Sequence, residues 1–168
     1  EMISAAAREE VDSIWIGRDL GYRGGRRTGL ALTDDVHFDL HLSRWGIRSP
    51  DPFLRGCAVS ERTASVVWDQ LQQLSGRILL WNVFPFHPYE NGNPLSNRSH
   101  TAREREVGEE LLSWLVEIVR PKSLVAVGRN ASASAQRCAG PCKVYEVRHP
   151  SYGGQRDFVR GIQDIYSV

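Results

Sequence analysis

Cysteine and long apolar runs are both scarce in this chain of 168 residues. The three cysteines, Cys57, Cys138 and Cys142, cannot all pair with one another. Their spacing supplies neither a four-ligand zinc set nor the four thiolates of an iron–sulfur cluster. No run approaches the roughly 18 apolar residues that a membrane helix requires, and the first residues lack the basic and apolar regions of a signal peptide. We therefore expect a reduced cytoplasmic protein that uses no metal or other cofactor and binds no membrane.

Neither sign of charge dominates, because 21 Lys and Arg residues face 20 Asp and Glu residues. This balance excludes a polycation that would coat nucleic acid non-specifically, so any nucleic-acid contact has to come from a local patch. Hydrophobic residues at 41% and charged residues at 24% are typical of a globular protein. The length fits one domain of about 100–200 residues, so residues 1–168 are expected to form a single domain.

Four short apolar runs, rich in β-branched or aromatic residues, indicate buried strands. Segments of helical character lie between them, and one of these begins with Thr101-x-x-Glu104, the pattern of a capping box. Alternating strands and helices predict an α/β fold, a three-layer α/β/α sandwich around a four-stranded, mainly parallel sheet. The expected strands cover residues 13–16, 77–83, 123–127 and 143–147, and the clearest expected helices cover 60–74 and 101–119.

Unusual residues follow each expected strand. In open α/β sheets, ligands bind in the crevice outside the carboxyl ends of the strands. A loop with five glycines and four arginines, residues 17–29, follows the first strand. The second strand ends at Asn82, the third at Gly128-Arg129-Asn130, and the fourth runs into residues 148–154. We therefore expect the functional chemistry at this one edge of the sheet.

Three side chains at this edge are candidates for chemistry, and each has a plainer alternative. Asp19 can orient a water or stabilise a cationic transition state, or it can be a turn residue bonded to its own backbone. Asn82 carries an acceptor and a donor that suit a base edge, or it caps the loop that follows. Phe84 can stack on a base or pack in the core. No nucleophile motif is present.

His149 precedes Pro150, which favours an extended backbone and directs the ring outward at the strand end. A histidine in that position can donate to an oxyanion that develops on a leaving base. A structural role is the alternative, and His87, which also precedes a proline, competes for the catalytic one.

Taken in chain order, these segments resemble the uracil-DNA glycosylase superfamily over about residues 12–160. The more specific matches are WNVFPFHP at 81–88 with NPLSNR at 93–98, and VRHPSYGG at 147–154. The resemblance implies an α/β/α sandwich that flips a pyrimidine nucleotide out of DNA and hydrolyses its glycosidic bond.

Roles for three residues follow from the resemblance. It implies that Asp19 places or activates the attacking water, that Asn82 reads the base, and that His149 stabilises charge on the departing base. The first motif departs from the family pattern, because relatives with similar later motifs commonly carry Gly-Glu-Ala-Pro-Gly where this chain has Gly-Arg-Asp-Leu-Gly. The acid stands where the classical uracil enzymes have Asp in Gly-Gln-Asp-Pro-Tyr.

Two aromatic walls of the family pocket are missing. Gly21 stands where the uracil enzymes have the tyrosine that blocks the C5 side of the pyrimidine, and Leu32 stands where relatives have the stacking phenylalanine. Losing both rings should enlarge the pocket, unless Tyr22 or Arg26 refills the space.

We therefore expect a DNA glycosylase that hydrolyses the N-glycosidic bond of a flipped, C5-modified cytosine, hydroxymethylated or glucosylated, and leaves an abasic site. Defence against phage DNA is one setting for such an activity. Removal of uracil in base excision repair is an alternative, and a catalytically silent DNA-binding module is another. The enzyme is expected to act as a monomer.

DNA contacts are expected from the arginine-rich loop after the first strand and from the turn after His149, with Tyr152 as the wedge that enters the stack. Glycines in both segments let the backbone approach phosphate closely. The candidate DNA-contacting residues are Arg18, Arg23, Arg26, Arg27, Arg98, Ser151, Tyr152, Gly153 and Gly154.

Overall fold

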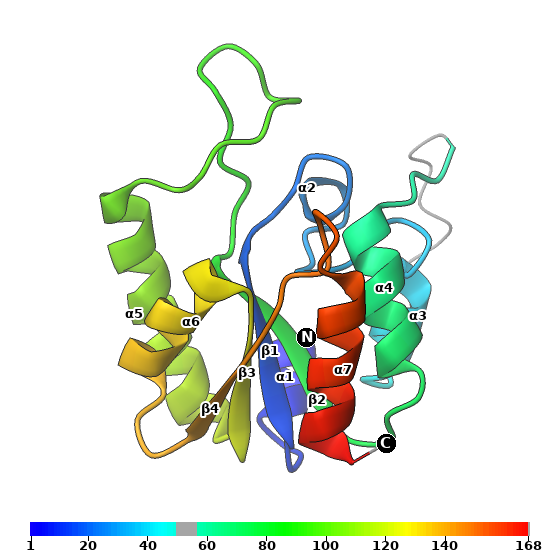
Figure 1. Cartoon of the computed structure of the whole chain (residues 1–168), viewed down its shortest axis with the longest axis vertical. Helices are drawn as coiled ribbons and strands as arrows, with labels where there is room; N and C mark the ends of the chain where they lie inside the picture. Colours follow the sequence, from blue (N-terminus) through cyan, green and yellow to red (C-terminus); the bar gives the residue numbers. More distant parts are fainter. Residues whose placement is uncertain (50–56, 168) are drawn as a thin grey trace.

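The computed structural model describes residues 1–49 and 57–167 and contains a four-stranded parallel sheet between two layers of helices (Figure 1). The predicted α/β/α sandwich is therefore confirmed. The strands are β1 (Ser13–Asp19), β2 (Ile78–Phe84), β3 (Ser123–Val127) and β4 (Lys143–Val147). The helices are α1 (Met2–Ala6), α2 (Gly25–Thr28), α3 (Phe38–Ser43), α4 (Arg62–Leu71), α5 (Ala102–Val119), α6 (Arg129–Cys138) and α7 (Gln155–Tyr166).

The two faces of the sheet have separate cores, and alternate residues of each strand enter one or the other. In β1, Ile14 and Ile16 pack with residues of α5 and α6, whereas Trp15 packs with residues of α4 and α7. All three side chains are fully buried. Figure 1 shows the same division, with α5 and α6 on one side of the sheet and α3, α4 and α7 on the other.

The strand order is β2-β1-β3-β4, so β1 lies in the middle of the sheet next to β3. The helices that follow β1 cover one face, and the helices that follow β2 and β3 cover the opposite face (Figure 1). The winding therefore reverses between β1 and β3, and this reversal opens a crevice at their carboxyl ends. β1 continues beyond the predicted Ile16 to Asp19, which pairs with Phe84, so Asp19 lies at that edge.

The start of α5 has the predicted capping box. The Thr101 hydroxyl accepts from the Glu104 N–H at 3.2 Å, and the Glu104 carboxylate accepts from the Thr101 N–H at 2.6 Å. One turn further on, α5 crosses the end of β2 so closely that a Cβ at Gly108 would lie 2.1 Å from the Val83 carbonyl oxygen. These two features place the first residues of α5 beside the carboxyl end of β2.

Candidate functional site

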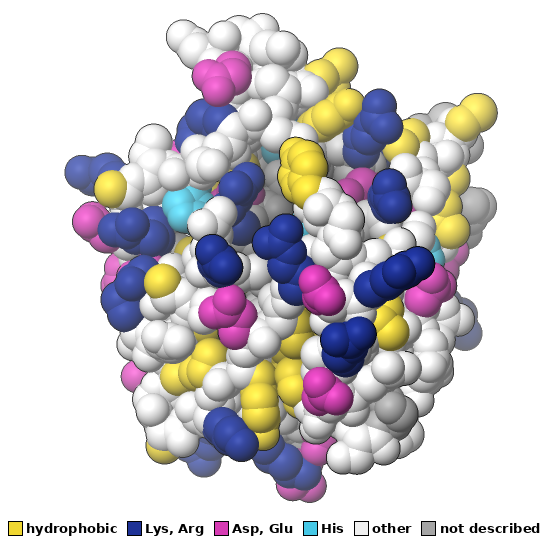
Figure 2. Space-filling model, viewed as in Figure 1, with side chains coloured by type: hydrophobic (Ala, Val, Ile, Leu, Met, Phe, Trp, Pro, Cys, Tyr) yellow, Lys and Arg dark blue, Asp and Glu magenta, His cyan; other side chains and the backbone are white. Residues whose placement is uncertain are grey.

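A cavity of about 590 Å³ lies at the carboxyl ends of β1, β3 and β4. Asp19 lines it from the end of β1, and His149 lines it from the segment after β4. The two residues predicted to be catalytic therefore share one cavity, although they are far apart in the chain. Arg18, Arg129 and Arg148 also line it, and Figure 2 shows Lys and Arg side chains gathered over this end of the sheet.

Both carboxylate oxygens of Asp19 are hydrogen-bonded. Oδ2 accepts from Nε of Arg18 at 2.6 Å, and Oδ1 accepts from Nδ1 of His100, which precedes α5. A carboxylate bonded by such donors is held in one orientation. Such a group can orient a water or stabilise a neighbouring positive charge.

His149 is held as a neutral imidazole. The Ser151 N–H donates to its Nδ1 at 3.2 Å, and the Ser151 hydroxyl lies 2.7 Å from the same nitrogen. Because Nδ1 accepts a hydrogen bond, the proton of the neutral ring belongs on Nε2. Burial, with help from the charges of Arg18 and Arg148, lowers the pKa of His149 below its ordinary value. The ring can therefore donate from Nε2 to an anion without first carrying a charge of its own.

Asn82 is not in the described lining of this cavity. Its side chain is 1% exposed and packs against Gly17, where a Cβ would lie 2.4 Å from the Asn82 amide. With the amide turned so that both ends find partners, Nδ2 donates to the Trp81 carbonyl at 3.1 Å and Oδ1 accepts from the Leu20 N–H at 3.3 Å. Leu20 itself lines the cavity. The Asn82 amide is therefore buried and committed to hydrogen bonds within the protein.

The two positions predicted to enlarge the pocket, Gly21 and Leu32, both line the cavity. Its two chain neighbours apart, a Cβ at Gly21 would have no atom of the described residues within 4 Å, so the space beside it is open. Leu32 has a φ of +51°, a left-handed conformation that costs a leucine about 1–2 kcal/mol. Its carbonyl oxygen accepts from the Trp68 indole N–H at 3.1 Å, which helps to hold this conformation.

Tyr22 and Phe84 do not belong to the described lining of the cavity. The Tyr22 hydroxyl accepts from Nε of Arg23 at 2.8 Å, and the Tyr22 N–H donates to the Asn97 side chain at 3.0 Å. Phe84 packs edge-to-face against Phe86 and His100. These contacts tie Tyr22 and Phe84 to neighbouring segments around the cavity.

The candidate DNA-contacting arginines divide into two groups. Arg18 bonds Asp19 at 2.6 Å, Arg27 bonds Asp35 at 2.5 Å, and Arg98 makes two 2.7 Å hydrogen bonds to Glu104, so these three are committed to contacts within the protein. Arg23 and Arg26 are exposed and bond the hydroxyl and carbonyl oxygens of Tyr22. Neither makes an ion pair with a carboxylate in the ranges described, which favours these two as phosphate contacts.

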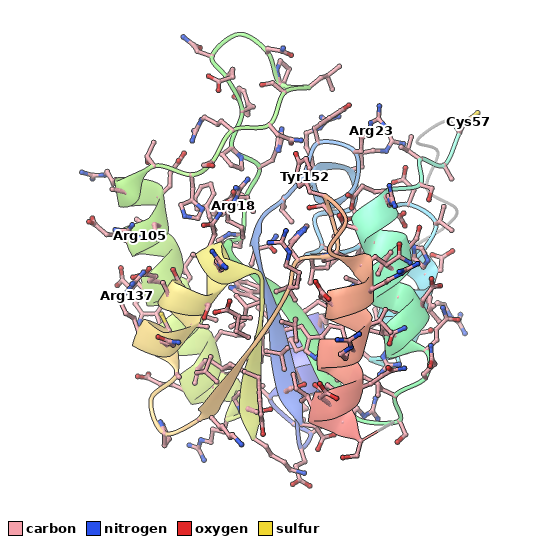
Figure 3. The ribbon with its side chains drawn as sticks, viewed as in Figure 1. Arg18, Arg23, Cys57, Arg105, Arg137 and Tyr152 are labelled. Atoms are coloured by element: carbon pink, nitrogen blue, oxygen red, sulfur yellow. The ribbon has the colours of Figure 1, made fainter. Side chains whose placement is uncertain are left out.

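The turn after His149 carries an aromatic ring at its tip. Tyr152 is 97% exposed and has a φ of +51°, followed by Gly153 at +77° (Figure 3). Gly154 has to be glycine, because a Cβ there would lie 2.1 Å from the His149 carbonyl oxygen. Ser151 bonds His149, so it orders the ring in addition to any DNA contact.

His100 was not identified from the sequence, and His87 has a different role from the one considered. His87 bonds the carbonyl oxygens of Leu20 and Pro94, at 2.8 Å and 3.2 Å, and so ties residues 87–98 to the loop after β1. One signal points to His100: it immediately precedes the capping box of α5, and a helix that follows a parallel strand begins at the carboxyl edge of the sheet.

Over residues 1–49 and 57–167, no group of three or more His, Cys, Asp or Glu side chains is arranged to hold a metal ion. In the same ranges, no helix combines the length and the apolar character needed to cross a membrane. No known family model matches the chain, and no curated protein matches it either. The functional proposal therefore rests on the residues and their geometry.

Proposed function

We propose that the protein is a DNA glycosylase that hydrolyses the N-glycosidic bond of a pyrimidine flipped into the cavity, and that it acts as a cytoplasmic monomer. The single observation that carries this proposal is that Asp19, a carboxylate, and His149, a neutral N–H donor, line the same cavity. Loss of a base leaves positive charge on the sugar and negative charge on the base. An ionised carboxylate and a neutral imidazole N–H match these two charges.

In this mechanism Asp19, held by Arg18 and His100, stabilises the developing positive charge at C1′ and orients the water that attacks there. The C1′–N bond breaks, and its electron pair leaves with the base. His149 donates a hydrogen bond from Nε2 to the oxygen on which that negative charge collects. The water oxygen becomes the hydroxyl of the abasic sugar, and its proton passes to solvent or to the base.

The size and lining of the cavity favour a base larger than uracil at C5, such as hydroxymethylated or glucosylated cytosine. A volume of about 590 Å³ falls in the range of sites for drug-sized ligands, roughly 300–1,000 Å³. The space beside Gly21 is open. The lining also includes groups that can bond sugar hydroxyls, namely Glu61, Thr63, Asn130 and Glu146. Cleavage of modified phage DNA is the setting we propose, with removal of uracil as the alternative substrate.

One observation favours a second candidate, a DNA-binding module without activity. Asn82, the residue expected to read the base, is bonded to the Leu20 N–H and is not in the described lining of the cavity. A protein in which Asn82 never reaches the base would bind DNA without cleaving it.

Asp19→Ala separates these functions. We expect the wild-type protein to produce alkali-labile abasic sites in a labelled oligonucleotide that carries the modified base. The variant should lower the single-turnover rate by about 10²–10⁴-fold, the usual contribution of a general acid–base group, with little change in DNA affinity. Asp39→Ala, which removes an exposed carboxylate on α3, is the matched control. Unchanged cleavage by Asp19→Ala would remove this residue from the mechanism, and DNA binding without cleavage by the wild type would favour the silent module.

A further inference from the structure

The Asp19 carboxylate has a partner that comes from a distant part of the chain. His100, in the segment between β2 and α5, bonds Oδ1 of Asp19 through Nδ1, and the two side chains are 11% and 5% exposed. An ionised carboxylate can only accept hydrogen bonds, so Nδ1 of His100 carries the proton and donates it. Asp19 lines the cavity, whereas His100 is not part of its described lining. Any effect of His100 on bound substrate therefore passes through Asp19.

The fold anchors His100 on both sides along the chain. Before it, Arg98 forms a two-pronged pair with Glu104 and donates to the Tyr89 carbonyl at 2.9 Å. After it, the Thr101 N–H donates to the same Glu104 carboxylate at 2.6 Å. These bonds, chiefly the one from Arg98, lower the pKa of Glu104 to about 2, so the anchor stays ionised near neutral pH.

A ring contact completes the arrangement. Phe84 packs edge-to-face on His100, with 6.3 Å between ring centroids, and Phe84 is the β2 residue paired with Asp19 in the sheet. The histidine therefore rests on the strand next to its carboxylate partner. Arg18 holds the other oxygen of Asp19 at 2.6 Å (Figure 3 labels Arg18). With one donor on each oxygen, the carboxylate is hindered from rotating about its last bond.

We propose that His100 is the positioning residue of the site: its Nδ1–H fixes the Asp19 carboxylate in the orientation that the reaction needs. This inference rests on the proposed function, because the orientation matters for activity only if Asp19 acts on C1′ and its water. Partners that orient a catalytic or ligating group commonly contribute about 10–100-fold to its function.

Two substitutions of His100 test the hydrogen bond. His100→Ala should lower the single-turnover rate by about 10–100-fold while leaving DNA affinity and KM nearly unchanged. His100→Asn should recover most of that loss, because the Asn amide N–H can occupy the place of Nδ1–H. Ser99→Ala, a change in the exposed neighbouring residue, is the control and should behave as the wild type. Wild-type activity in His100→Ala, or equal losses in the Ala and Asn variants, would overturn the proposal.

A second readout does not depend on catalysis. In proton NMR of the wild-type protein, the His100 Nδ1–H that donates to Asp19 should give a downfield, slowly exchanging signal. His37 also bonds Asp34 through Nδ1 at 2.6 Å, so the His100 signal is the one that His100→Asn removes. That signal should be absent from His100→Asn and lost or shifted in Asp19→Ala. Its absence from the wild type would overturn the inference. A wild type that shows the signal but frees no base from any substrate would overturn the proposed function and leave the Asp19–His100 pair standing.

Discussion

Tyr152 combines two features that are unfavourable for a residue with no function. Its ring is 97% exposed, and its backbone has a φ of +51°, which is uncommon for an aromatic residue. The turn that carries it is hydrogen-bonded to His149 at Ser151 and packs closely against the His149 carbonyl at Gly154. An aromatic ring in this position is suited to enter a base stack when the neighbouring nucleotide is flipped toward the cavity.

We expect Tyr152→Ala to slow cleavage of duplex DNA far more than cleavage of a single-stranded oligonucleotide of the same sequence. The reason is that unstacking costs a few kcal/mol in a duplex and much less in a single strand. Single-turnover rates on the two substrates give the ratio. Trp114→Ala, which removes an exposed aromatic ring on α5 away from the cavity, should leave the ratio unchanged. An equal effect of Tyr152→Ala on both substrates would rule out a wedge.

Among the elements, α5 has the most to do with the geometry of the site. Its capping box sets its first residue, and Gly108 lets its backbone lie directly on the Val83 carbonyl at the end of β2. His100 immediately precedes this helix, and Asp19 pairs with the neighbouring Phe84. The close approach of α5 to β2 therefore sets how near His100 comes to Asp19.

Gly108→Ala should lower the free energy of unfolding by about 1–3 kcal/mol, the usual cost of overpacking. The loss is expected although alanine favours a helix over glycine by about 1 kcal/mol, because the added Cβ would lie 2.1 Å from a carbonyl oxygen. Urea denaturation measures the change. Glu110→Ala, an exposed change on the same helix, should fall within about 0.5 kcal/mol of the wild type. A Gly108→Ala protein at least as stable as the wild type would show that α5 is free to move off β2.

The elements were predictable where a local pattern determines them. The apolar runs predict β3 and β4 with their observed bounds, and the Thr101-x-x-Glu104 pattern predicts the start of α5. The placement of Asp19 and His149 at one edge followed from the alternation of strands and helices. Two contacts depend on how loops pack together: the hydrogen bond of His100 to Asp19 and that of Asn82 to the Leu20 N–H. No local spacing in the sequence encodes that packing.

At the scale of the whole molecule, the parallel direction of all four strands brings the loops that follow them to one end (Figure 1). The net charge is only +1, and the cavity at this end is lined by both signs of charge: Arg18, Arg129 and Arg148 with Asp19, Glu61 and Glu146. Under the proposed function, the exposed Arg23 and Arg26 supply phosphate contacts at one place, without the non-specific coating expected of a polycation. This arrangement matches a protein that presents one cavity to DNA.

The central claim is tested most directly by identifying the base released from DNA. Oligonucleotides with uracil, thymine, hydroxymethylcytosine or glucosylated hydroxymethylcytosine are incubated with the wild type and with Gly21→Tyr, and the free bases are identified by mass spectrometry. Gly21 has open space at its Cβ and no positive φ, so the variant should fold. We expect the wild type to release a C5-modified cytosine and Gly21→Tyr to lose that activity while sparing any release of uracil. Release of uracil alone would contradict the proposed substrate, and release of no base would contradict the proposed reaction.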